Sequence, residues 1–190
     1  MAFNWFELQR TAHREFGTRV AAITDWNALT PDREWDVTQL VRHVIEEQQW
    51  VPPLLEGKTV AEATPELLPL HGDMRAEWQR YSDAATRAWS SADPQMQVHL
   101  SYGTVPLEPY LRQQTADVTI HAWDLARATG SDESLDPALV EAVWSDLDAQ
   151  RDMLAESGLF DPPVDVPDDA PLQDRLIALT GRDPRPSRLR

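Results

Sequence analysis

The sequence feature that most constrains the fold is the segment 107–129, which lies between Pro106 and Gly130. Its apolar side chains recur with the spacing of one helix face, and they are Leu107, Leu111, Val118 and Leu125. Gly130 is a residue type that commonly ends helices, because glycine adopts the left-handed conformation without strain. The segment is therefore predicted to be a long helix with one buried face.

Capping signals predict further helices. Asn4 with Glu7, and Asp36 with Gln39, have the spacing of an N-terminal capping box. Together with apolar spacing, such signals predict helices over residues 4–23, 36–53 or shortly beyond, 73–89, 136–158 and 172–179, with connections at 24–35 and 57–72 and an irregular tail at 161–169. The alternation at residues 95–104 allows one short strand. We therefore expect an all-α, up-down four-helix bundle with a short extra C-terminal helix and at most a minor β segment, forming a single domain over residues 1–190.

Charge and composition exclude several classes of protein. The chain has 190 residues and a net charge of −15, which nucleic-acid phosphates and anionic membrane surfaces would repel. No apolar run reaches the roughly 20 residues of a membrane helix, and the N-terminus lacks the features of a signal peptide. We expect a cytoplasmic protein that binds neither nucleic acid nor membrane. The absence of cysteine excludes disulfides, thiolate zinc sites and a protein thiol nucleophile.

Three residues have the spacing of a metal site. Asp117 and His121 are separated by one helical turn beside the apolar stripe of their helix, so both side chains project in the same direction. His43 lies at the edge of the buried face of the helix that begins near residue 36. If the two helices pack together, these residues offer three ligands to one divalent ion and leave a position open for water or substrate, as in catalytic sites.

The ligand types leave the metal open. Imidazole and carboxylate suit zinc, nickel, iron or manganese, and zinc is the first expectation because proteins use it so commonly. Each residue also has a simpler interpretation. A histidine near an apolar helix face is often half-buried without binding a metal, and an Asp–His pair one turn apart is often an ordinary surface pair.

Three further side chains are weaker candidates. Glu47 lies one turn after His43 and suits an outer ligand or a base, although a solvated role is the simpler expectation. Asp124 suits an outer position that orients a ligand, with a local cap or pair as the favoured alternative. Tyr110 lies two turns before Asp117 and suits contact with a substrate, although a core position is favoured.

These segments resemble a known family. The run Asp117-Val-Thr-Ile-His121-Ala-Trp-Asp-Leu-Ala-Arg-Ala-Thr-Gly130 is similar to the hallmark of actinobacterial proteins related to the N-terminal domain of mycothiol-dependent maleylpyruvate isomerase, within the DinB-like superfamily. Residues 35–43, Trp-Asp-Val-Thr-Gln-Leu-Val-Arg-His, resemble its first ligand motif, and residues 173–184 resemble its usual C-terminus.

The resemblance implies a DinB-like bundle with a divalent metal held by His43, Asp117 and His121. It also implies a low-molecular-weight thiol such as mycothiol, an electrophilic substrate, isomerase or S-transferase chemistry, and a homodimer. Two features depart from the family. The carboxylate is usually glutamate where this chain has Asp117, and the isomerase has an additional C-terminal domain that contributes to its substrate site. Because this chain ends before such a domain, we expect a reaction other than maleylpyruvate isomerisation.

Three functions therefore stay open at this point, in order of preference. The first is a metal-dependent, thiol-dependent S-transferase or related enzyme. The second is a non-catalytic bundle that binds a metal or a small molecule. The third is a bundle that binds no metal and acts through partner contacts.

Overall fold

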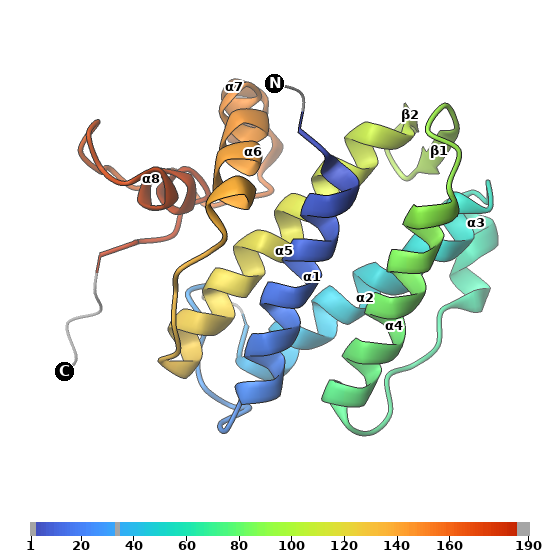
Figure 1. The fold of residues 1–190 in the computed structure, drawn as a ribbon, viewed down its shortest axis with the longest axis horizontal. Coiled ribbons are helices and arrows are strands. Elements are labelled where there is room, and N and C mark those ends of the chain that lie inside the picture. Colours follow the sequence, from blue (N-terminus) through green and yellow to red (C-terminus); the bar gives the residue numbers. More distant parts are fainter. Residues whose placement is uncertain (1–2, 33–34, 186–190) are drawn as a thin grey trace. The chain divides into compact units, whose positions relative to one another are not determined.

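The computed structural model describes residues 3–32 and 35–185. The chain forms two compact units, the first ending at Glu133 and the second beginning at Ser134. The first unit is built from four long helices, whose bounds are Trp5–Ala22 for α1, Val37–Leu55 for α2, Met74–Ser91 for α4 and Leu107–Thr129 for α5. Helix α1 packs on α5 and α2 packs on α4, while contacts of α1 with α4 and of α2 with α5 close the bundle (Figure 1).

The predicted helix starts are confirmed by side-chain caps. The side chain of Asn4 accepts a hydrogen bond from the backbone N–H of Glu7. Asp36 and Gln39 form a complete capping box, in which each side chain bonds the other residue's backbone N–H. These bonds satisfy N–H groups that the first turn of a helix leaves without partners.

The core of the first unit lies between the four helices. Its largest fully buried side chains include Phe16, Leu40, Ile45, Trp89, Leu111, Ile120, Trp123 and Leu125. Burying one such side chain stabilises a fold by about 1.5–3 kcal/mol relative to leaving it exposed. The apolar stripes of all four helices therefore meet in one core, which fixes how α2 and α5 face each other.

A small hairpin lies between α4 and α5. Strand β1 (Gln97–Leu100) pairs antiparallel with β2 (Gly103–Pro106), and Val98 faces Val105 across the ladder. The alternation in the sequence indicated the first strand only. The second strand reads as a turn and a helix start, because glycine and proline bound it.

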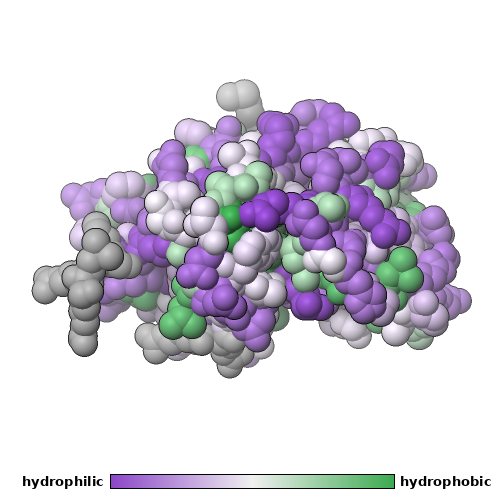
Figure 2. Space-filling model, turned by 90° about the horizontal axis from the view of Figure 1, so that it is seen from below, coloured by the Kyte–Doolittle hydropathy of each residue, from purple (hydrophilic) through white to green (hydrophobic). Residues whose placement is uncertain are grey.

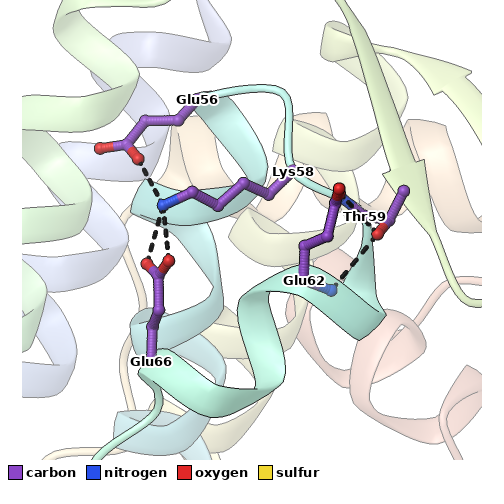
Figure 3. A network of polar contacts seen from close by, with 5 residues as sticks. All are labelled: Glu56, Lys58, Thr59, Glu62 and Glu66. Carbon is purple, nitrogen blue, oxygen red and sulfur yellow. Dashed lines mark hydrogen bonds and ion pairs between the residues drawn. The ribbon is translucent and has the colours of Figure 1, made fainter.

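The connection after α2 contains short helices that the sequence analysis did not predict. Helix α3 spans Val60–Ala63 and the 3₁₀ helix η1 spans Thr64–Glu66. Figure 3 shows the polar contacts that hold them: Thr59 and Glu62 form a capping box, and the ammonium of Lys58 bonds Glu56 at 2.9 Å and Glu66 at 2.7 Å. The spacing of Thr59 and Glu62 is a signal that could have revealed α3.

The second unit contains α6 (Pro137–Asp148), α7 (Arg151–Ser157) and α8 (Leu172–Leu179), and α6 packs on α8. The prediction of one continuous helix over residues 136–158 was wrong, because the helix breaks between α6 and α7. The side chain of Gln150 donates to the carbonyl oxygen of Asp146 at 3.0 Å, while the Gln150 N–H bonds Leu147 instead. The side chain of Gln150 thus occupies the carbonyl oxygen of Asp146, which in a continuous helix would accept from the backbone N–H of Gln150.

The predicted all-α class with a minor β segment is confirmed. Within the described residues, no helix is long and apolar enough to cross a membrane. The face of the molecule drawn in Figure 2 is mainly hydrophilic, with hydrophobic residues in small separate patches. The extent of one domain over residues 1–190 stays a prediction.

Acid should destabilise the protein through His13, which is buried in the bundle. Burial lowers the pKa of His13 to about 4, against weaker opposing effects of Gln48, Ser82 and Asp83. Between pH 6.5 and 4 the unfolded chain therefore binds more protons at His13 than the folded chain, so stability falls as the pH falls through this window.

We expect His13 to account for a loss of about 2 kcal/mol between pH 7.5 and pH 5. Urea unfolding of the parent and of His13→Gln at both pH values isolates this contribution from the other titrating groups. The variant should lose less stability on acidification by that amount. An equal loss in both proteins would contradict the prediction.

Alanine should be tolerated less well at Gly181 than at Gly158. Both glycines have a positive φ, 79° and 70°, which costs alanine about 1–2 kcal/mol. A Cβ at Gly181 would also lie 2.5 Å from Cβ of Asp161, whereas nothing lies within 4 Å at Gly158. We expect Gly181→Ala to lower the free energy of unfolding by about 1–3 kcal/mol more than Gly158→Ala, as measured by urea titration. Equal losses would show that Asp161 moves aside without cost.

Candidate metal centre

Helices α2 and α5 bring His43, Asp117 and His121 together. His43 lies in the first half of α2, and Asp117 and His121 lie one turn apart on α5. One potential ligand atom from each residue lies within 4.8 Å of the other two. The three residues selected from the sequence therefore share one site in the folded chain.

The distances between the Asp117 carboxylate and the two imidazoles are longer than hydrogen-bond distances. Oδ1 of Asp117 lies 3.7 Å from Nε2 of His43 and 3.5 Å from Nε2 of His121, whereas N–H···O hydrogen bonds are mostly about 2.7–3.2 Å long. Two ligand atoms bound tetrahedrally to a zinc ion at about 2.0–2.2 Å would lie about 3.4 Å apart. The arrangement thus fits atoms that share a small cation.

The site is partly exposed to solvent. The side chains of His43 and Asp117 are 30% and 27% exposed, whereas that of His121 is only 8% exposed. Oδ2 of Asp117 is buried and has no hydrogen-bond partner among the described residues. A buried carboxylate oxygen without a donor is costly, and a cation bound to Asp117 would offset that cost. The donor set and this unpartnered oxygen therefore both fit a divalent metal.

Asp124 fixes the orientation of His121. Its Oδ2 lies 3.0 Å from Nδ1 of His121, and its side chain is fully buried. Nδ1 therefore carries the proton and donates to Asp124, which leaves Nε2 facing Asp117. Metal-binding histidines usually have such a partner on the other ring nitrogen. The local pairing favoured from the sequence is confirmed, and it also performs the orienting role.

Trp35 packs against both imidazoles, a contact that no pattern in the sequence indicated. Its ring centroid lies 4.6 Å from that of His43 and 5.6 Å from that of His121. Thr30 holds the backbone in place, because its hydroxyl donates to the carbonyl oxygen of Trp35 at 2.8 Å. Residues 24–35 carried no periodic signal, so only the folded chain shows this role.

The charges at the site are coupled. Burial opposes the charged form of Asp117, but His121 and His43 outweigh it and hold the pKa of Asp117 well below its usual range. Burial also opposes the charged form of His121, but Asp117 and Asp124 raise its pKa to about 9. The carboxylates of Asp117 and Asp124 thus favour positive charge on the imidazole of His121.

The remaining candidates lie close by. Glu47 is half-buried, and its Oε2 accepts a hydrogen bond of 3.1 Å from the amide of Gln114. Tyr110 is buried and packs on Trp89, and its hydroxyl has no hydrogen-bond partner within residues 3–32 and 35–185. The core position favoured for Tyr110 is confirmed, whereas the solvated position favoured for Glu47 was wrong because Gln114 draws its carboxylate inward.

Comparison with solved structures shows the fold. The crystal structure of the mycothiol-dependent maleylpyruvate isomerase matches with a TM-score of 0.59 over 75% of this chain and 68% of that protein, at 15% sequence identity. A variant of the same isomerase matches equally well. At this level of identity the likeness extends to the fold alone.

Comparison of sequences shows the family. Uncharacterized proteins from two strains of Mycobacterium tuberculosis are each 30% identical over 161 residues, which is 82% of this chain and 84% of the relative. The family model described as the mycothiol maleylpyruvate isomerase N-terminal domain matches residues 9–126, a range that contains His43, Asp117 and His121. The chain therefore belongs to the mycothiol maleylpyruvate isomerase N-terminal domain family.

Proposed function

We propose that this protein binds one divalent metal ion through His43, Asp117 and His121 and acts as a thiol-dependent S-transferase or a related enzyme. The observation that carries the proposal is the set of three ligand atoms within 4.8 Å of one another on a partly exposed surface. Membership of a mycothiol-related family supports a low-molecular-weight thiol as one reactant. A small electrophile is the second reactant.

Each side chain has a defined task in this proposal. Nε2 of His43, Nε2 of His121 and the carboxylate of Asp117 would hold the ion, and Asp124 keeps His121 in the required orientation. When bound, a divalent ion supplies Lewis-acid chemistry that lowers the pKa of a coordinated thiol. Because the chain has no cysteine, the sulfur nucleophile comes from the small-molecule thiol.

The ligand types are compatible with several metals. Two imidazoles and one carboxylate suit zinc, nickel, iron and manganese, and we propose zinc first. The reaction also needs a compartment that keeps thiols reduced, which the cytoplasm provides. A homodimer, implied by the family resemblance, stays a prediction.

Metal content is the first test. We expect purified protein, prepared without a metal-binding tag, to contain about one equivalent of a transition metal by elemental mass spectrometry. His43→Ala and His121→Ala should each lose it, because two ligands rarely retain such an ion. His71→Ala is the matched control, since His71 is exposed and lies outside the site. A parent that binds no zinc, nickel, iron or manganese even after incubation would refute the proposal.

Asp124→Asn should weaken metal binding without removing a ligand. The amide can still accept a hydrogen bond from His121, but the negative charge that supports the imidazole is gone. Loss of such a partner typically costs about 10–100-fold in metal affinity. Competition with a chelator measures this ratio, and circular dichroism checks that the variant is folded. An unchanged affinity would limit Asp124 to a structural role.

Thiol-dependent consumption of an electrophile tests the chemistry. The metal-loaded parent should accelerate S-alkylation of mycothiol or a smaller monothiol by a generic electrophile, and His121→Ala should not. If the protein binds metal and thiol but never turns over a panel of electrophiles, it is a binding protein rather than an enzyme.

A further inference from the structure

Glu47 is a further carboxylate near the candidate metal site. It lies one turn after His43 on α2, so both side chains project from the same face of the helix. It is half-buried, and it interacts electrostatically with Asp117 and His43. Because like charges repel, the carboxylate of Asp117 disfavours the ionised form of Glu47. An unfavourable placement of this kind is common where a carboxylate has a functional role.

A directed chain of hydrogen bonds crosses the bundle and ends on Glu47. The imidazole of His13 on α1 lies 3.0 Å from Oε1 of Gln48, and the amide of Gln48 donates to Oε1 of Gln114 at 3.3 Å. The amide of Gln114 then donates to Oε2 of Glu47 at 3.1 Å. Each amide uses its oxygen on one side and its nitrogen on the other. The chain therefore fixes one carboxylate oxygen of Glu47 and leaves the other, Oε1, without a hydrogen bond to any of the described residues.

We propose that Glu47 is the proton acceptor of this site, held in position by Gln114 and Gln48. This inference rests on the proposed function. Oε1 of Glu47 takes the proton of the incoming thiol, and the electron pair of the broken S–H bond stays on sulfur. When that sulfur forms a bond to the electrophile, the electron pair displaced there takes the proton back from Glu47. The proton count balances over one cycle, and the carboxylate is restored.

The surroundings of Glu47 favour this role. Burial raises its pKa, and the negative charges of Asp117 and Glu46 raise it further, whereas Gln114 and His43 oppose the change. Tyr110 also faces Glu47 from α5. A carboxylate whose pKa is raised toward neutral pH exchanges protons with a thiol more effectively than an ordinary surface glutamate.

The test uses cobalt-loaded protein and 2-mercaptoethanol, with no electrophile present. A thiolate bound to Co²⁺ produces a charge-transfer absorbance, whose rate of appearance is followed by stopped flow from pH 6 to pH 9. Glu47→Gln keeps the shape of the side chain and can still accept from Gln114. Glu141→Gln is the matched control, because it makes the same change at an exposed glutamate of the second unit, outside the unit that holds the site.

We expect Glu47→Gln to bind one equivalent of cobalt and to form the absorbance about 100-fold more slowly than the parent. Its rate should rise with hydroxide concentration, whereas the parent rate should level off once Glu47 is ionised. Glu141→Gln should match the parent, and Glu47→Asp should recover part of the rate because a carboxylate is restored.

Two results would overturn the inference while leaving the proposed function intact. The first is a Glu47→Gln rate within about twofold of the parent across the pH range, which lies far below the usual contribution of a general base. The second is loss of cobalt in Glu47→Gln, which would make Glu47 a ligand. Failure of the parent to bind cobalt at all would instead refute the metal site itself.

Discussion

The site depends on the packing of α2 against α5, which places the carboxylate of Asp117 between two imidazoles. Burying a charge costs several kcal/mol unless an opposite charge and hydrogen bonds compensate for it. Here His43 and His121 approach one carboxylate oxygen, while the other is buried and receives no hydrogen bond from the part of the chain that the structure describes. A divalent cation, as we propose, would satisfy all three side chains at once. The same packing also brings Glu47 and Gln114 into contact at the edge of the site.

Much of the bundle could be predicted because its signals are local. The bounds of α5 follow from the apolar stripe and Gly130, and the start of α2 follows from the capping box of Asp36 and Gln39. The pairing of Asp117 with His121 was predictable for the same reason, because two residues one turn apart on a helix must project together. His43 required the further assumption that two amphipathic helices pack with their buried faces together.

The rest depends on contacts between distant segments. Trp35 lies in a connection without periodic apolar spacing. The hydroxyl of Thr30 donates to the backbone carbonyl oxygen of Trp35, and this hydrogen bond helps to hold the indole against the imidazole of His43. The break after α6 arises from the side chain of Gln150, with no proline or glycine to mark it. Glu47 looked solvated because sequence spacing cannot show that Gln114 reaches it from another helix. Such roles are set by tertiary geometry.

The most direct test of the metal site is anomalous diffraction from crystals of the metal-loaded protein, recorded at the absorption edge of the bound metal. We expect one strong peak between α2 and α5. For a zinc ion, it should lie about 2.0–2.2 Å from Nε2 of His43, Nε2 of His121 and a carboxylate oxygen of Asp117. A peak bound by other residues, or no peak in crystals soaked with excess metal, would contradict it.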